Sequence, residues 1–327
     1  MDPRRIIIIG GQSFQVGELL EKIEENGLPV SEVRILDDGD RCGEIHDFRG
    51  EPVLVGRIET LPEEAFDLAI LLTPVKDPRT LVETLVHGGI PFLDASGSIP
   101  LTDEVPLLWK RPSGDRFRQS VPKVAMFPGV YSLCSLCVLE AMHRESEIES
   151  VRMFVLQGAS ARGTRRAMDE LFDQAREILN FKDPTLEEWP RQLCFNAFPL
   201  SEAAGEEIRM GNEIRHALAA PWISVGVDIA WACFFVGFLG TIWVTFREDT
   251  DLNRLSRALG TSPNLHWSDT DEPPGILDVV GQDKIYMSQL RTNGTARNVT
   301  LRFALDNMRA GFSARLTELI AWYLKET

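Results

Sequence analysis

The first 130 residues alternate between short apolar runs and amphipathic stretches, and this alternation limits the possible folds more than any other feature of the sequence. Residues 6–9 are four isoleucines in a row, which predicts a buried strand. Apolar residues then recur at helical spacing, at Val16, Leu19, Leu20 and Ile23. Further strands are predicted at residues 32–36, 52–56, 68–72, 90–94 and 123–127, with a helix at 81–87. Strands that alternate with helices form a mostly parallel sheet.

From about residue 150 the order of the elements changes. Strands are predicted at residues 151–157, twice within 223–246, and at 285–290 and 299–305, with long helices at 164–180 and 202–219. The dipeptide Asn293-Gly294 between the last two strands is a strong hairpin signal. Strands that are segregated from their helices are typical of an α+β domain with an antiparallel or mixed sheet.

Together these patterns predict an α/β protein of two domains. The first is a Rossmann-type doubly wound parallel sheet in residues 1–129, and the second is an α+β domain in residues 130–305. One face of a final helix carries Leu316, Leu319, Ile320 and Tyr323. We expect this helix to pack back on the first domain, so residues 306–327 are assigned to it.

Composition excludes several classes of function. The formal net charge of −15 repels phosphate backbones and anionic lipids, so we expect no nucleic-acid partner and no membrane partner. The apolar stretch at 223–246 is rich in β-branched and aromatic residues, which favours two buried strands over a membrane helix. Five cysteines, an odd number without a secretory signal, fit the reduced thiols of a cytoplasmic protein.

The turn after the first strand occupies the place of a dinucleotide-binding loop. Its candidate cofactor-binding residues are Gly11, Ser13, Gln15, Val16 and Gly17. Phe14, however, stands where such loops have their central glycine, and it disfavours a close approach of pyrophosphate. Three carboxylates beyond the second strand, Asp37, Asp38 and Asp40, argue against the 2′-phosphate of NADP. We therefore expect no bound cofactor, with NAD or NADP as the alternative.

Several blocks, in order along nearly the whole chain, resemble bacterial aspartate-semialdehyde dehydrogenase. The blocks are residues 7–17, 67–72, 94–98, 124–132, 154–163, 191–199, 212–215 and 306–311. The resemblance is closer still to the inactive-looking paralogue of that enzyme in many bacteria, the usg-type protein. The family reduces an acyl phosphate through a thioester on a cysteine, with hydride from NADPH and a histidine that handles protons. It also forms its subunit interface with the second domain, which implies a homodimer.

The resemblance implies that the catalytic positions have been lost. Val130 holds the place of the nucleophilic cysteine and Phe238 that of the histidine. The family's carboxylate-binding arginine falls on Trp231, and a second arginine falls on Pro100. Apolar replacement at every one of these positions suggests a cleft filled with side chains. An open, solvated pocket between Val130 and Phe238 would refute this hypothesis.

Other family positions persist. Gln157 matches the glutamine that positions substrate, Glu206 matches the ligand of the substrate amino group, and Arg209 replaces a lysine. Arg215 and Asn307 are also retained. For all of them the favoured interpretation is maintenance of the scaffold by helix capping and buried hydrogen bonds.

The remaining cysteine signal lies just beyond Val130. Cys134 and Cys137 lie one turn apart on a helix, and two buried core thiols are favoured over a metal site. No metal site is predicted, because neither a His-rich segment nor a second cysteine pair completes one.

Three functions remain open at this stage. The first is a non-catalytic homologue with a structural or regulatory role, which acts as a homodimer or as a heterodimer with an active family member. The second is an NAD(P)-dependent oxidoreductase of a small carbonyl or semialdehyde substrate, with Tyr131, Ser132 or Cys134 as proton donor in place of the cysteine route. The third is a sensor that binds an amino acid through Glu206 and Arg215.

Overall fold

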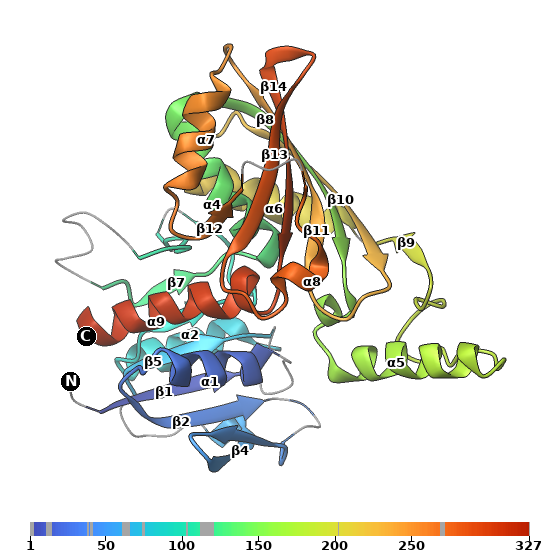
Figure 1. The fold of residues 1–327 in the computed structure, drawn as a ribbon. Helices are drawn as coiled ribbons and strands as arrows, with labels where there is room; N and C mark the ends of the chain where they lie inside the picture. Colours follow the sequence, from blue (N-terminus) through green and yellow to red (C-terminus); the bar gives the residue numbers. More distant parts are fainter. Residues whose placement is uncertain are drawn as a thin grey trace. The chain divides into compact units, whose positions relative to one another are not determined.

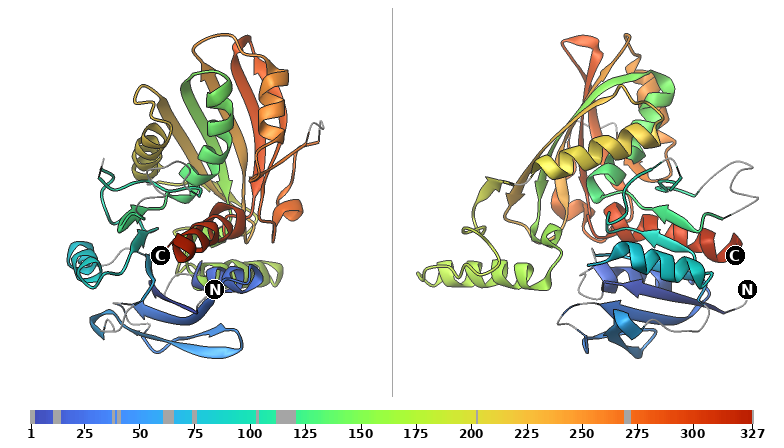
Figure 2. Two further views of the ribbon diagram at one scale, coloured as in Figure 1. Left: turned by 90° about the vertical axis from the view of Figure 1, so that its left-hand side faces the viewer. Right: turned by 180° about the vertical axis from the view of Figure 1, so that it is seen from behind.

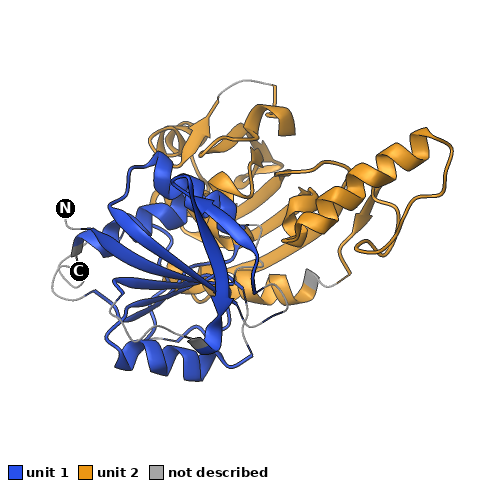
Figure 3. Ribbon diagram, turned by 90° about the horizontal axis from the view of Figure 1, so that it is seen from below, with its two compact units in different colours: residues 1–129, 313–327 blue, residues 130–312 orange. Residues whose placement is uncertain are grey.

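The computed structural model describes residues 3–10, 15–37, 39, 42–60, 66–73, 76–102, 104–111, 121–201, 203–268 and 272–326. The chain divides into two compact units, residues 1–129 with 313–327 and residues 130–312 (Figure 3). Residues 306–312, which we had assigned to the first domain, therefore lie in the second unit. The reason is local: the Asp306 carboxylate accepts the backbone N–H of Gly281, and Asn307 accepts that of Gly237.

The first unit contains a seven-stranded sheet of order β3-β4-β2-β1-β5-β6-β7, in which only the β3–β4 pair is antiparallel. Its strands are β1 (Arg4–Ile9), β2 (Val30–Asp37), β3 (Ile45–Phe48), β4 (Glu51–Arg57), β5 (Leu68–Leu71), β6 (Phe92–Asp94) and β7 (Val124–Met126). Its described helices are α1 (Gln15–Glu25), the 3₁₀ turn η1 (Ile58–Thr60), α2 (Pro78–His87) and α9 (Ala314–Glu326) (Figure 1). The predicted Rossmann-type topology is confirmed.

Both faces of this sheet are buried, which explains the run of isoleucines in β1. Ile7 and Ile9 belong to one core cluster with Leu81 and Leu85 of α2. Alternate strand residues point to the opposite face, where α9 contacts both α1 and β5. Tyr323 of α9 is buried, and its hydroxyl donates to the Pro122 carbonyl at 3.3 Å. The prediction that the final helix packs on the first domain is confirmed.

The second unit contains a mixed seven-stranded sheet of order β12-β13-β14-β11-β8-β10-β9. Its strands are β8 (Ile148–Gln157), β9 (Ala197–Pro199), β10 (Ser224–Ala232), β11 (Phe238–Phe246), β12 (Leu265–Trp267), β13 (Ile285–Asn293) and β14 (Thr295–Leu305). Its described helices and turns are α4 (Val130–Glu145), η2 (Ala159–Arg162), α5 (Arg165–Leu179), α6 (Ala203–Ala217), α7 (Leu252–Gly260), α8 (Ile276–Val279) and η3 (Arg309–Ser313). The predicted α+β architecture of this domain is confirmed.

The apolar stretch at 223–246 forms β10 and β11, as predicted, but the two strands do not pair with each other. Both flank β8, β10 in parallel and β11 antiparallel. In the described part of the chain, no helix is long and apolar enough to cross a membrane. The predicted hairpin is also present, with Gly294 at a φ of 82° between β13 and β14.

The two faces of the second sheet differ in what covers them. Helices α4, α6 and α7 lie over one face, which we call the closed face (Figure 2). In β8, Val151, Met153 and Val155 point toward these helices and are buried. The alternate residues Arg152 and Phe154 point to the other side and are exposed. We call that side the open face.

Candidate functional site

One row of residues on the closed face contains three positions that the sequence singled out. Gln157, the last residue of β8, is in register with Trp231 of β10 and with Phe238 of β11. Residues in register on adjacent strands point to the same face. The structure therefore places the retained glutamine between the positions that match the family's arginine and histidine. All three side chains are at most 5% exposed.

Tyr131, near the beginning of α4, covers the Phe238 end of this row. Its ring stacks on that of Phe238, with the centroids 5.3 Å apart and the planes inclined by 10°. Its hydroxyl donates a hydrogen bond to Oε1 of Gln157. Burial, reinforced by the nearby Glu206 carboxylate, raises the pKa of Tyr131 far above its usual value. Sequence reasoning considered this tyrosine only as a proton donor and missed its packing role.

Val130, the first residue of α4, is half-buried against η3. A side chain at Gly311 would bring its Cβ within 3.0 Å of Cγ2 of Val130 and within 3.2 Å of Cδ1 of Leu305. Such a distance leaves no room for a larger residue at Gly311. The backbone of η3 thus approaches Val130 closely. On the sheet nearby, Phe238 is only 1% exposed beneath Tyr131.

Trp231 extends the row into an apolar cluster. Its ring meets that of Trp189 edge to face, with the centroids 4.8 Å apart and the planes at 77°. Buried residues from η2, from α5, from the segment before β9 and from β9 itself also belong to this cluster: Ala159, Ala167, Leu171, Leu193, Cys194 and Phe198. Arg162 of η2 places its guanidinium over the Trp189 ring at 5.8 Å.

The three charged candidates on α6 point in different directions. Arg209 pairs with the buried carboxylate of Glu213, its Nε 2.9 Å from the oxygen. Arg215 donates to the Ile223 carbonyl at 3.2 Å and to Asn212 at 3.0 Å. Glu206 precedes Arg215 by nine residues, which places the two on opposite sides of a helix at about 100° per residue. The geometry does not bring Glu206 and Arg215 together as a sensor would require.

Two polar residues just after β14 hold loops in place. Oδ1 of Asn307 accepts hydrogen bonds from the Ser160 hydroxyl and from the Gly237 backbone, both at 2.7 Å. Asp306 likewise accepts the backbone N–H of Gly281 and of Met308, both at 2.8 Å. The amide oxygen of Asn307 thus joins η2 to Gly237, the residue before β11, and the cofactor-binding role of Asn307 stays a prediction.

The candidate proton donors for a cysteine-independent reaction are all buried. The Tyr131 hydroxyl is committed to Gln157, and Ser132 is 1% exposed. The thiol of Cys134 in α4 is buried. Its burial, and to a smaller extent the neighbouring Cys137, raises the pKa of this thiol. Cys137 is also buried. Among the described residues, no three His, Cys, Asp or Glu side chains gather in a way that could hold a metal ion.

The candidate cofactor residues of the first unit are only partly described. Gly11, Ser13, Phe14, Asp38 and Asp40 lie outside the described residues. Val16 is a core residue, so its side chain does not face a ligand, whereas a Cβ added at Gly17 would meet no atom within 4 Å.

Asp37, at the end of β2, lies where a dinucleotide-binding domain contacts the ribose of its cofactor. It is 3% exposed, and its Oδ1 accepts the Gly39 N–H at 2.7 Å. A carboxylate here does not fit the 2′-phosphate of NADP.

A buried carboxylate of the first unit was missed by sequence reasoning. Asp94 ends β6 and is fully buried. It accepts four hydrogen bonds from the next five residues, from the Ser96, Gly97 and Ile99 backbones and from the Ser96 hydroxyl. These bonds shape the turn that leads to the exposed Pro100. A buried strand that ends in Asp followed by Ser-Gly-Ser is the sequence signal for such a turn.

Comparison with known proteins agrees with this architecture. The chain is 22% identical to the aspartate-semialdehyde dehydrogenase of Rickettsia bellii, with 98% of each chain covered. It is 25% identical to the USG-1 protein homolog of Azotobacter vinelandii, over 100% of this chain and 99% of that one. The structure superimposes on aspartate semialdehyde dehydrogenase II from Vibrio cholerae with a TM-score of 0.89, at 19% identity and 99% coverage of both chains.

The family assignment rests on the second unit. Residues 139–310, more than half of the chain, match the family described as semialdehyde dehydrogenase, dimerisation domain. The sequence resemblance to aspartate-semialdehyde dehydrogenase is thereby confirmed, and the chain belongs to the semialdehyde dehydrogenase family.

Proposed function

We propose that this protein is a non-catalytic member of its family, with a structural or regulatory role. The observation that carries the proposal is the packed row of the closed face. There Phe238, at the position that resembles the family's histidine, stacks under Tyr131. Valine at position 130 has no atom that could attack an acyl phosphate or form a thioester. Restoring the cysteine alone would therefore not restore catalysis, because the packed rings of Tyr131 and Phe238 would still occupy the space that a substrate needs.

Catalysis is tested in the oxidative direction. The purified protein is incubated with aspartate semialdehyde, phosphate and NADP⁺ or NAD⁺, and the reduced nicotinamide is followed by absorbance. We expect no rate above that of the blank. We also expect none from the V130C/F238H variant, because the tryptophan at 231 still occupies the space of an anion-binding arginine. The Rickettsia bellii enzyme serves as the positive control, and turnover by the unmodified chain would contradict the proposal.

The proposal includes the absence of a working nucleotide site. Its support is Phe14 at the place of the loop's central glycine, together with the buried Asp37 carboxylate at the end of β2, which disfavours the 2′-phosphate of NADP but not NAD. Titration calorimetry with NADP⁺ and NAD⁺ in separate experiments tests this part. We expect no heat of binding at millimolar nucleotide. Micromolar binding of either nucleotide would revive the oxidoreductase alternative and would make a screen of carbonyl substrates the next experiment.

We further propose that the protein is a homodimer built through the open face of the second sheet. The match to a dimerisation domain supports this, as do two large aromatic residues on the face. Phe154 and Trp243 are 36% and 38% exposed on adjacent strands. Sedimentation velocity at micromolar concentration tests it. A dimer is expected, and a monomer would contradict this part without touching the loss of catalysis.

A regulatory role would need a partner, and an active family member is the partner that a shared dimerisation domain favours. Co-expression of the tagged chain with an active aspartate-semialdehyde dehydrogenase from the same cell, followed by affinity capture, tests for mixed dimers. Recovery of the active subunit in stoichiometric amount is expected. Recovery of the homodimer alone would contradict a regulatory role through mixed dimers with the active enzyme.

A further inference from the structure

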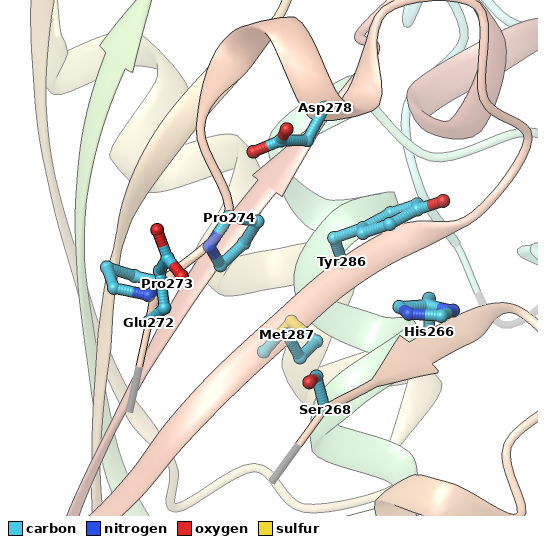
Figure 4. A pocket seen from close by; sticks show the side chains of 8 residues that line it. All are labelled: His266, Ser268, Glu272, Pro273, Pro274, Asp278, Tyr286 and Met287. Atoms are coloured by element: carbon cyan, nitrogen blue, oxygen red, sulfur yellow. The ribbon is translucent and has the colours of Figure 1, made fainter. Parts of the chain in front are cut away.

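A cavity of about 340 Å³ lies at the edge of the second sheet, apart from the closed-face row (Figure 4). It lies between β12, β13 and the segment that leads into α8. Its lining residues are His266, Ser268, Glu272, Pro273, Pro274, Asp278, Tyr286 and Met287. This volume is at the small end of the range for sites that bind small organic molecules.

The cavity is distinct from the candidate site because its aromatic residues belong to the other face of the sheet. Tyr286 is in register with Ala304, and Ala304 with Leu239. Phe238 is the neighbour of Leu239 on the same strand and points the opposite way. A ligand in the cavity would therefore not reach the packed row of Tyr131 and Phe238.

The strand register builds an aromatic wall of this cavity. His266 of β12 is in parallel register with Tyr286 of β13, so their side chains project side by side. The two rings stack with their centroids 4.3 Å apart and their planes inclined by 28°. On the opposite side, Pro273 and Pro274 present ring carbons with little conformational freedom (Figure 4). Because the two rings cover one face of each other, the pair offers only its outer aromatic surface. That surface opposite the rigid prolines favours a ligand with a flat apolar body.

The negative charge of the cavity favours a cationic group at the other end of that ligand. Its described lining residues include the carboxylates of Glu272 and Asp278 and neither a lysine nor an arginine. Oδ2 of Asp278 accepts the Gly275 N–H at 2.7 Å, and a carboxylate has further lone pairs with which to accept from a ligand. Aromatic faces also attract cations. The formal net charge of the whole chain is −15, so the electrostatic field around the cavity also favours cations.

We propose that this cavity binds a small organic cation, an ammonium or guanidinium group attached to a flat apolar body. The body lies between the His266–Tyr286 wall and the two prolines, and the cation lies at the carboxylates of Glu272 and Asp278. The proposal does not use the lost catalytic residues. Tyr286 shares the open face with Phe154 and Trp243, but it lies at the β12–β13 edge of the sheet, with β14 between β13 and β11.

Three isosteric probes test the proposal on the full-length protein: benzylammonium, benzyl alcohol and benzoate. Calorimetric or NMR titration is expected to show benzylammonium binding about tenfold more tightly than benzyl alcohol, with no binding of benzoate. The affinity for benzylammonium is expected to fall as salt is added. Equal affinity for the cation and the alcohol, or no binding of the cation at millimolar concentration, would overturn the proposal.

Variants locate the binding. E272Q/D278N is expected to weaken benzylammonium binding about tenfold. The control E248Q/D249N removes the same charge from an exposed loop and is expected to leave binding unchanged. An equal loss in both pairs would show that only net charge matters and would overturn the site. Because Asp278 also caps α8, H266L provides a second variant that removes the aromatic wall without touching the carboxylates. Unchanged affinity in a folded H266L variant would likewise overturn it.

Discussion

The closed and open faces of the second sheet are made from alternate residues of the same strands, yet they carry different chemistry. In β8, Gln157 of the closed face lies under Tyr131 and next to Phe238. Phe154, three residues earlier on the open face, has 36% of its surface exposed. The closed face carries the positions that resemble the family's catalytic residues. The open face carries the surface that we assign to dimerisation.

Under the proposed function, one face of the sheet loses its chemistry while the other keeps its assembly surface. Because side chains alternate along a strand, a substitution on one face leaves the other face almost unchanged. Aromatic residues at 231 and 238 turn a polar face into core, which adds apolar burial to the domain. We infer that the loss of a catalytic cleft can stabilise the fold that presents the dimer surface.

The largest difference between the faces is expected from removing one phenylalanine from each. F238A should lower the free energy of unfolding by about 3–5 kcal/mol, because the fully buried ring leaves a cavity next to Tyr131. F154A, on the open face, should cost about 1 kcal/mol. Urea unfolding at one protein concentration, followed by circular dichroism, measures both values. Equal costs would mean that the closed face is not packed as described.

On the open face, we expect substitutions to change the dissociation constant of the dimer. W243A is expected to weaken the dimer by about 2 kcal/mol, roughly a thirtyfold rise in Kd, since exposed tryptophans dominate protein interfaces. W222A is the matched control. Trp222 is 42% exposed but precedes β10 and donates to the Ile148 carbonyl. Sedimentation equilibrium measures the dimer dissociation constant of both variants, and W222A is expected to leave it unchanged. An unchanged dimer in W243A would place the interface elsewhere.

The hydrogen bond across the closed face should have a smaller effect. Y131F should cost about 1–2 kcal/mol, because the buried carbonyl of Gln157 loses its donor. Adding Q157L should recover part of this loss, since the pair is then apolar on both sides. Y286F, at a half-buried tyrosine of the open face, is the control and should change stability by less than about 0.5 kcal/mol. Full additivity of Y131F and Q157L would show that the two groups do not interact.

The smallest effect concerns the thiols beside the closed row. Burial, and then the neighbouring Cys233 thiol, raises the pKa of Cys194 to about 11. The folded state thus favours the neutral thiol, and the stability from this shift is present below about pH 9 and is lost as pH rises toward 11. At pH 8, N-ethylmaleimide should label the exposed Cys233 well before Cys194, as peptide mass spectrometry would record. Equal labelling rates would contradict the burial of Cys194.

Sequence reasoning predicted the long elements better than the contacts between them. The helix at 164–180 was predicted within a residue of α5, because Thr164 and Asn180 cap it. The short edge strands β9 and β12 were missed, since three residues show no period. The register that aligns Trp231, Gln157 and Phe238 could not be predicted, nor could the stacking of Tyr131 on a ring 107 residues away. Such contacts depend on tertiary packing rather than on local pattern.

The position of α9 has a consequence for synthesis on the ribosome. This last helix completes the core of the first unit by contacting α1 and β5, while residues 130–312 form the second unit without it. The nascent chain can therefore finish the second unit before the first. Until Leu316, Leu319 and Ile320 emerge, the earliest strands remain without their last apolar cover. We expect a chain that is truncated before residue 313 to keep the assembly surface and to engage chaperones through its N-terminal half.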